Sequence, residues 1–565
     1  MRSHRLARTA ILAVAALLIG TQATGCSLPS VKQDSKPEAS TAPTTAAPAT
    51  TPQHTRRLEQ PVTLHVLAGS EVKDMAEVLE EATKATNVRM TFEFTGTLDG
   101  AETVAAGKAT GKHDAIWFSS NRYLSLIPDA SKRIASSTKI MASPVVLGLK
   151  KPVAHRLGWD TKAPTWSEIA KAAEAKKFSY GMTDPSASNS GFSALVAVAT
   201  ALSGGGAALD GQRATAVAPD LRRFFSAQTM TSGSSGWLAD QFVDKADKPG
   251  GPDGIVNYES VLLGLNAAGK LKDSLSVVVP SDGVVTADYP LTLLSGADEQ
   301  TRNAYTAVTD WLRTPDAQKL IMDKTSRRPA VPGVKTDARF GDQLLVELPF
   351  PGQRAVVDDL ITSYLNSIRR ATQTIYVLDL SGSMRGKRIA ALRRALISLA
   401  GGDRKISPSG FAVFRERETV SLLGYSDRAK QPRIFSVPDG GSRTVLADIR
   451  SAARDLEAGG NTATYSALEA GYRLAAKQTR SQPGALTSIV LMTDGETNRG
   501  ASAAEFRRFY RSLPREARAV PTFTVKFGAA GAKPLKALAT LTGGDLIEAE
   551  GNSLAKAFKE IRAYQ

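Results

Sequence analysis

The chain of 565 residues contains one cysteine, Cys26, and five histidines. A single cysteine excludes an intrachain disulfide and any zinc site built on several thiolates. The histidines lack HxxxH and HExxH spacings, which would place two of them on one helix face around a metal. GxSxG and P-loop motifs are missing too. We therefore expect that the chain is not an enzyme, because no nucleophile, general base or phosphate-binding loop can be named.

Long hydrophobic runs are also missing, since no stretch approaches the roughly 18 apolar residues of a membrane-spanning helix. The short apolar run at 11–20 follows three arginines and no acid within 2–10. This pattern is typical of a secretory signal peptide, which we place at 1–26. Its last residues, Ala-Thr-Gly-Cys, resemble a bacterial lipobox. The resemblance implies lipidation of Cys26 and a lipid-anchored protein on the extracytoplasmic face of the cell membrane; the alternative is an ordinary signal peptide with an incidental cysteine.

Large apolar residues are scarce at 27–60, where Ser, Thr, Pro and Ala dominate, and this composition predicts a disordered tether. The net charge of +16 is unevenly spread, because residues 371–565 hold 30 Lys and Arg against 18 Asp and Glu. This change in net charge near residue 370 predicts a domain boundary there, with a linker at 351–370. The arginines of the basic region indicate a solvated face or attraction to anionic envelope polymers or lipid headgroups. No nucleic-acid-binding signature is present, so we expect no nucleic-acid partner.

Residues 61–350 alternate short apolar runs with amphipathic patterns. Strands are predicted at 63–67, 88–94, 115–118, 144–149 and 275–280. Helices are predicted at 73–86, 167–175, 191–202, 300–312 and 317–324. This alternation indicates an α/β domain with mainly parallel strands.

Several local patterns in this region occur in an order that resembles the extracellular solute-binding proteins of bacterial transport systems. Leu-Ala-Gly-Ser at 67–70 ends the first strand, Pro-Thr-Trp-Ser-Glu at 164–168 opens a helix, and Asp-Pro-Ser-Ala-Ser-Asn-Ser-Gly at 184–191 opens another. The resemblance implies a bilobal type II periplasmic-binding-protein-like fold over 61–350. It also implies a small solute as the ligand.

Small polar residues gather where the predicted strands end and helices begin. Ligands of open α/β sheets bind beyond the carboxyl ends of the strands, where N–H groups and hydroxyls suit a polar or anionic solute. Helix capping is the alternative role for any one of them, and Arg327 and Arg328 are hinge or surface charges in the alternative interpretation. The ligand-binding candidates are Ser70, Thr97, Ser119, Ser120, Ser188, Asn189 and Ser190.

Three short motifs stand out in residues 371–565. The run at 374–378 predicts a buried strand followed by Asp-x-Ser-x-Ser, and the run at 488–492 predicts another followed by Thr-Asp-Gly. A Gly-Gly-Asn-Thr loop at 459–462 lies between them. Strands of one parallel sheet bring such ends to one edge. The candidate metal ligands are Asp379, Ser381, Ser383, Thr462 and Asp494.

Two carboxylates and three hydroxyls, completed by water, form the six-oxygen set that Mg²⁺ prefers, and Mn²⁺ or Ca²⁺ are the alternatives. Hydroxyl ligands add no negative charge, so the cation keeps an open position for a carboxylate from a partner. The arrangement closely resembles the von Willebrand factor A domain, a Rossmann-like fold, and its metal-ion-dependent adhesion site. By this resemblance the five residues coordinate the metal, and Asp494 acts either directly or through water.

These features together predict a membrane-anchored extracytoplasmic binding protein. Its metal site at 371–565 would bind a protein partner that supplies a carboxylate, and its module at 61–350 would bind a small polar or anionic solute. One alternative is the solute receptor of an ABC transporter, with the C-terminal domain as a docking module. A metal-dependent hydrolase is the other alternative, but the sequence offers it no general base.

Overall fold

The computed structural model describes residues 56–248, 250–402, 413–439, 443–528 and 531–549, together with 554, 557, 558 and 561. Cys26, the expected signal peptide and the expected tether up to residue 55 lie outside the described residues. Within the described part of the chain, no helix combines the length and apolar character needed to cross a membrane.

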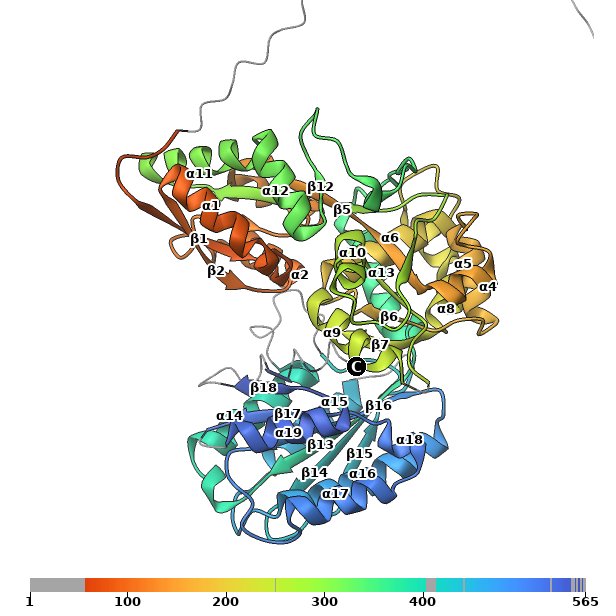
Figure 1. The fold of residues 1–565 in the computed structure, drawn as a ribbon. Helices are drawn as coiled ribbons and strands as arrows, with labels where there is room; N and C mark the ends of the chain where they lie inside the picture. Colours follow the sequence, from red (N-terminus) through yellow and green to blue (C-terminus); the bar gives the residue numbers. More distant parts are fainter. Residues whose placement is uncertain are drawn as a thin grey trace, which may run out of the picture. The chain divides into compact units, whose positions relative to one another are not determined.

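The first domain contains two sheets, one in each lobe (Figure 1). The five-stranded sheet of the first lobe has the order β2-β1-β3-β11-β4. β1 is parallel to β2 and β3, whereas β11 is antiparallel to β3 and β4. The strands of this lobe are β1 (Val62–Ala68), β2 (Val88–Phe94), β3 (Ala115–Trp117), β4 (Ile134–Lys139) and β11 (Pro290–Leu294). Its helices include η1 (Ser70–Met75), α1 (Ala76–Thr86), α2 (Thr97–Ala105), α11 (Glu299–Leu312) and α12 (Pro315–Thr325).

The second lobe has a seven-stranded sheet in which β10-β5-β8-β6-β7 are neighbours and β9 and β12 also pair with β5. β6 is parallel to β7 and β8, and β5 is antiparallel to β8 and β9. Its strands are β5 (Met141–Lys150), β6 (Tyr180–Thr183), β7 (Gln228–Ser232), β8 (Gly254–Tyr258), β9 (Leu275–Val278), β10 (Thr286–Ala287) and β12 (Arg328–Pro329). Its helices include α4 (Lys151–Leu157), α5 (Trp166–Glu174), α6 (Asn189–Leu202), α8 (Ala218–Phe225), α9 (Ser235–Ala246) and α10 (Glu259–Ala268).

The chain crosses between the two sheets three times, from β4 to β5, from β10 to β11 and from α12 to β12. Two of these crossings contain residues with positive φ, Tyr289 (φ 38°) and Ser326 (φ 53°). A left-handed backbone is costly for a bulky side chain, so the surrounding contacts must hold Tyr289 in place. The crossings also correct the expectation of mainly parallel strands. Each lobe has a parallel centre, but β5 and β11 enter from the other lobe and run antiparallel to their neighbours.

The segment expected to be a linker, 351–370, is instead largely helical. It forms α13 (Arg354–Ser363) and a π-helical turn (Tyr364–Ile368). Their apolar side chains, including Val357, Leu360 and Ile361, belong to the same buried cluster as the core of the first domain. The linker expectation is therefore corrected, because this segment contributes to a hydrophobic core.

The second domain is one six-stranded sheet with the order β15-β14-β13-β16-β17-β18, shown with its helices in Figure 1. All neighbours are parallel except β14 and β15. The strands are β13 (Thr372–Asp379), β14 (Glu418–Tyr425), β15 (Arg433–Ser436), β16 (Leu486–Thr493), β17 (Thr522–Phe527) and β18 (Leu546–Ala549). The helices include α14 (Lys387–Ile397), α15 (Arg443–Arg454), α16 (Thr464–Ser481), α17 (Ala503–Ser512), α18 (Arg515–Arg518) and α19 (Ala532–Thr542).

Alternate side chains of β13 pack into two separate cores, one on each face of the sheet. Tyr376 and Leu378 belong to the cluster that contains residues of α14 and α15. Ile375 and Val377 belong to the cluster that contains residues of α16, α17 and α19. A sheet covered by helices on both faces explains why every residue of β13 is buried.

Candidate functional site

The predicted metal ligands lie at the carboxyl edge of the second domain's sheet. β13 ends at Asp379, and its parallel neighbour β16 ends at Thr493, directly before Asp494. From β13 the chain continues to β14 on one side and later returns to β16 on the other side. This is a topological switch point, the position where open α/β sheets form a ligand crevice.

A chain of hydrogen bonds joins the two carboxylates. Oδ1 of Asp379 accepts from the backbone N–H of Ser381 at 2.8 Å, and Oδ2 accepts from the hydroxyl of Thr493 at 2.7 Å. The hydroxyls of Ser381 and Ser383 lie 2.9 Å apart, and Ser383 donates to Oδ1 of Asp494 at 2.7 Å. The structure therefore brings four of the five predicted ligands into one hydrogen-bonded group.

Thr462, the fifth predicted ligand, lies in a loop that is hydrogen-bonded to the Asp-x-Ser-x-Ser turn. The N–H of Gly382 donates to the carbonyl of Gly460 at 2.9 Å, and the N–H of Gly459 donates to that of Leu380 at 2.7 Å. The N–H of Thr462 donates to the side chain of Asn498 at 2.8 Å. Thr462 itself is buried, and its loop is hydrogen-bonded to the turn that carries Ser381 and Ser383.

Both carboxylates of this site are removed from water. Asp379 is 0% exposed and Asp494 is 1% exposed. Burial raises the pKa of Asp379, and the nearby charge of Asp494 acts in the same direction. Two buried carboxylates at one edge favour the binding of positive charge, part of which Arg388 supplies to Asp494 and the rest of which a divalent cation would supply.

The donor set fits a hard divalent cation. Among the described residues, no group of three or more His, Cys, Asp or Glu side chains forms a metal-binding cluster. A metal at this edge would be held by the carboxylates of Asp379 and Asp494 together with the hydroxyls of Ser381, Ser383 and Thr462. Oxygen ligands with only two negative charges are suited to Mg²⁺ with water completing its shell.

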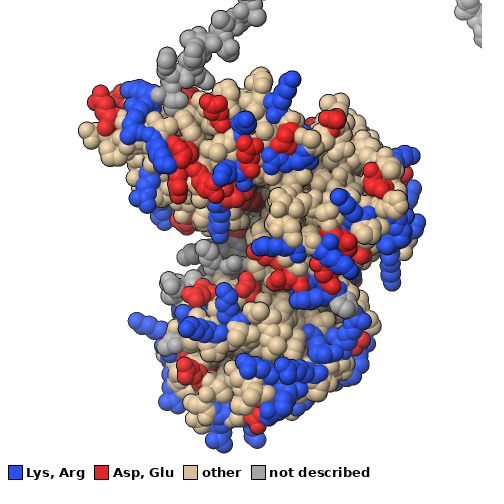
Figure 2. All heavy atoms as spheres, viewed as in Figure 1, with Lys and Arg blue, Asp and Glu red and all other residues tan. Residues whose placement is uncertain are grey.

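Arg388 is a residue of this site that sequence reasoning missed. Its Nη1 donates to Oδ2 of Asp494 at 2.6 Å and to the carbonyl of Ser383 at 3.1 Å. For the arginines of this basic domain, whose Lys and Arg side chains are blue in Figure 2, the sequence indicated a solvated face or attraction to anionic envelope polymers or lipid headgroups. Its place in the first turn of α14, directly after the motif, is the signal that could have pointed to the site.

The candidate ligand-binding residues of the first domain occupy strand ends and helix starts, as expected. Ser119 and Asn189 are brought together by Tyr258, whose hydroxyl donates to Ser119 at 3.0 Å and accepts from Asn189 at 3.1 Å. Ser119 and Ser120 follow β3, whereas Asn189 and Ser190 begin α6. Tyr258, at the end of β8, was missed because an apolar strand gives no sign that its last residue turns toward a polar cluster.

The hydroxyls at the start of α6 are largely used inside the protein. Ser190 lies 2.8 Å from the hydroxyls of Thr183 and Ser235 and 3.3 Å from that of Ser188. These contacts favour the structural alternative for this group. Three further candidates show no hydrogen bond to this cluster within the described residues. They are Ser70, which begins η1, Thr97, which begins α2, and Ser120, which accepts from Arg122 N–H at 3.3 Å.

Arg327 is fully buried between the lobes and organises charged and aromatic groups that sequence reasoning did not connect. Its Nη1 donates to both carboxylate oxygens of Asp74 at 2.8 Å, and its Nη2 donates to the carbonyl of Glu71 at 2.7 Å. The guanidinium lies 4.7 Å from the ring centre of Tyr289. The two lobes also pack closely where Gly96, before α2, faces Ala187, before α6. A Cβ on Gly96 would lie 2.7 Å from the carbonyl oxygen of Ala187.

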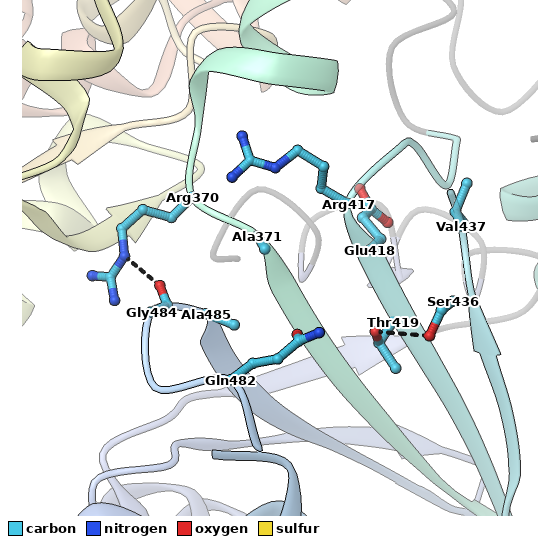
Figure 3. A pocket seen from close by; sticks show the side chains of 10 residues that line it. All are labelled: Arg370, Ala371, Arg417, Glu418, Thr419, Ser436, Val437, Gln482, Gly484 and Ala485. Carbon is cyan, nitrogen blue, oxygen red and sulfur yellow. Dashed lines mark hydrogen bonds between the residues drawn. The ribbon is translucent and has the colours of Figure 1, made fainter. Parts of the chain in front are cut away.

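A separate pocket of about 430 Å³ lies at the opposite, amino edge of the second domain's sheet (Figure 3). It is lined by residues around the starts of β13 and β14, including Arg370 and Arg417. Nε of Arg370 donates to the carbonyl of Gly484 at 2.9 Å. The hydroxyls of Thr419 and Ser436, two other residues that line the pocket, lie 3.3 Å apart. Ligands of open α/β sheets generally bind beyond the carboxyl ends of the strands, so this pocket at the amino edge is a weaker candidate than the carboxyl edge.

Two family models match the chain. Residues 64–324 match "Bacterial extracellular solute-binding protein", and residues 375–557 match "von Willebrand factor type A domain". The inter-alpha-trypsin inhibitor heavy chain H4 of Sus scrofa is 28% identical over 129 residues, which are 22% of this chain and 12% of that protein. The alignment thus spans a small part of the length of this curated relative.

Solved periplasmic binding proteins are also similar to the first part of the chain. AfuA from Actinobacillus pleuropneumoniae, solved with fructose-6-phosphate, is 15% identical, covers 54% of this chain and 98% of its own, and has a TM-score of 0.41. A periplasmic thiamin binding protein is 14% identical, covers 55% of this chain and 97% of its own, and has a TM-score of 0.42.

The family matches and the observed sheets agree on the architecture. A periplasmic-binding-protein-like α/β domain is followed by a von Willebrand factor A domain. The match to an extracellular solute-binding family supports an extracytoplasmic binding protein. Both matched families are of binding or adhesion type rather than enzymes.

Proposed function

We propose that this chain, a solute-binding-like domain joined to a von Willebrand factor A domain, is a lipid-anchored receptor that captures a protein partner through a divalent cation. The observation that carries the proposal is the pair of buried carboxylates, Asp379 and Asp494, linked through serine hydroxyls at a switch point of the sheet. The anchor would be Cys26. The cation would be Mg²⁺, with Mn²⁺ or Ca²⁺ as substitutes.

Each residue of the site has a defined task in this proposal. Asp379 supplies a fully buried negative charge, and Thr493 and the N–H of Ser381 orient it. Ser381, Ser383 and Thr462 contribute neutral oxygens, so they add no negative charge beyond the two carboxylates and leave the cation its Lewis acidity. When bound, the cation supplies a Lewis-acidic centre that attracts a carboxylate of the partner protein.

The first domain would bind a small polar solute between its lobes. Tyr258, Ser119 and Asn189 form a hydrogen-bonded group at that position, and Arg327 and Tyr289 lie at the crossings between the lobes. The family match over residues 64–324 supports a second candidate function, the solute receptor of an ABC transporter. In that case the second domain would serve for docking.

The proposal is tested on the full chain by calorimetry and thermal unfolding with Mg²⁺ or EDTA. Wild type is expected to bind Mg²⁺ and to gain thermal stability from it, whereas Asp379→Ala is expected to do neither. Asp448→Ala, which removes an exposed carboxylate on α15, is the matched control and should behave as wild type. Equal binding of envelope proteins by wild type and Asp379→Ala in Mg²⁺ would contradict partner capture.

The two candidate functions are separated by a solute panel in the same calorimeter. Small anions, sugars and amino acids are titrated into wild type with and without Mg²⁺. A micromolar or tighter solute, whatever the metal does, would favour the transport receptor. Mg²⁺ binding without a solute would favour the metal-dependent receptor.

A further inference from the structure

Arg388 makes a direct contact with the candidate metal site although it is not part of the five-residue motif. Its side chain is 38% exposed, whereas the side chain of Asp494 is 0% exposed. The guanidinium therefore reaches from solvent into a buried carboxylate, at 2.6 Å between Nη1 and Oδ2. A charge-assisted hydrogen bond of this length is among the stronger contacts that a carboxylate makes.

The loop after β17 leaves room for this guanidinium. A Cβ on Gly528 would lie 3.1 Å from Nε of Arg388, 3.2 Å from Cζ and 3.3 Å from Nη2, all closer than ordinary contact. Gly528 also has φ 72°, a conformation that disfavours any side chain. Asp494 thus holds the guanidinium by a hydrogen bond, and the lack of a side chain at Gly528 leaves the space that the guanidinium occupies.

The oxygens of Asp494 are both engaged with the protein. Oδ1 accepts from the hydroxyl of Ser383, and Oδ2 accepts from Arg388. A divalent cation that uses these oxygens must share them with a positively charged guanidinium or displace it. Two positive charges within a few ångströms of each other repel, and solvent screens only part of this repulsion because the side chain of Arg388 is 38% exposed and the carboxylate between them is buried.

We propose that Arg388 is the chain's own counter-cation for Asp494 and that it competes with the divalent metal for this carboxylate. The inference rests on the proposed metal-dependent function and concerns the regulation of that site. Arg388 would lower the metal affinity below the value that the five ligands alone would give. It would also keep Asp494 charge-paired when the metal concentration falls, so that the site loads and unloads reversibly.

The test measures Mg²⁺ binding and thermal unfolding of full-chain variants. Arg388→Met keeps the apolar stem but removes the charge, and we expect a Kd for Mg²⁺ about tenfold lower than that of wild type. In EDTA its unfolding temperature should be lower, and the rise on adding Mg²⁺ should be larger. Arg394→Met, which changes an exposed arginine of the same helix, is the matched control and should leave both quantities unchanged.

A second variant, Gly528→Ala, tests the same competition in case Arg388→Met does not fold. Gly528→Ala leaves the charge in place but crowds the guanidinium, so the Kd for Mg²⁺ should again fall, by about threefold. An unchanged or weaker Mg²⁺ affinity in folded Arg388→Met would overturn the competition. Failure of the proposed function looks different, because wild type itself would then show no Mg²⁺ binding and would match Asp379→Ala.

Discussion

Glu259 in the first domain and Asp379 in the second are both buried carboxylates, but they differ in the groups that donate hydrogen bonds to them. Glu259, at the start of α10, receives two hydrogen bonds from Arg328, at 2.7 Å from Nε and 2.8 Å from Nη2. Asp379 receives its hydrogen bonds from the N–H of Ser381 and the hydroxyl of Thr493, which are both neutral. One carboxylate is therefore neutralised by the protein, and the other is only oriented by it.

The difference separates a structural charge from a candidate functional one. A buried ion pair with bidentate geometry satisfies both partners and leaves nothing for a ligand. A buried carboxylate that receives hydrogen bonds only from neutral groups has no positive side chain to balance its charge. Burial therefore raises its pKa, as it does for Asp379. In the second domain this carboxylate lies at the carboxyl edge of the sheet, where we propose that a cation binds.

The largest effect is expected from breaking the Glu259–Arg328 pair. Arg328→Ala would leave the carboxylate of Glu259 buried and unpaired, which costs about 3–5 kcal/mol of folding free energy. Arg339→Ala is the control, because its ion pair with Asp337 is about one-third exposed on each side and should contribute only about 0–1 kcal/mol. Scanning calorimetry of the full chain measures both variants. Equal losses would mean that burial does not distinguish the two pairs.

Asp379→Asn, in contrast, should weaken Mg²⁺ binding without lowering the stability of the fold. Asparagine keeps an acceptor for the N–H of Ser381 but removes the charge, so the unfolding temperature in EDTA should not fall. Its Mg²⁺ affinity should drop about 100-fold or more, because one of two charged ligands is lost. Calorimetric titration and thermal unfolding with and without Mg²⁺ measure the two quantities. Mg²⁺ binding at wild-type strength would exclude Asp379 as a ligand.

A smaller effect is expected at Thr462, which would contribute one neutral oxygen. Thr462→Ala removes this hydroxyl but leaves the backbone contact to Asn498, and Mg²⁺ affinity should fall about tenfold. Thr462→Ser retains the hydroxyl and should bind Mg²⁺ within about twofold of wild type. Metal titration of the two variants is the measurement. A similar loss in both would point to loop packing rather than ligation.

Apolar runs in the sequence predicted individual strands of both domains because such runs reflect burial, whereas the bilobal and von Willebrand factor A architectures were expected from the family resemblances. The strand predicted at 88–94 coincides with β2, and the runs at 374–378 and 488–492 are the centres of β13 and β16. The β6, β7 and β8 strands were missed because each is short and nearly wholly buried, so none alternates. The segment 351–370 was mistaken for a linker since its apolar side chains pack against a neighbouring surface that local sequence does not reveal.

The two candidate sites were not equally predictable. Metal ligation needs particular residues at fixed spacing on adjacent strands, so Asp379 and Asp494 could be proposed from sequence and are brought to one edge. The polar group of the first domain depends on Tyr258 and Arg327, which come from distant segments and are joined only by the fold. Arg388 was missed for the same reason, since its partner Asp494 is 106 residues away in the chain.

The smallest effect expected is a pH dependence that comes from Asp379. Because burial raises the pKa of its carboxyl, the folded chain without metal binds a proton there more readily than the unfolded chain does. Stability in EDTA should therefore fall as pH rises from the ordinary Asp range, near 3.9, to the raised pKa of the folded chain, and should then level off. Asp379→Asn should lack this component.

Mg²⁺ should reverse the sign, because the metal binds only the ionised carboxylate and its stabilising effect grows with pH. The measurement is the unfolding temperature as a function of pH over the range described above. It is made for wild type and for Asp379→Asn, each in EDTA and in Mg²⁺. Superimposable profiles for the two proteins in EDTA would show that Asp379 titrates normally. In that case the contrast with the paired Glu259 would rest on the hydrogen-bond partners alone.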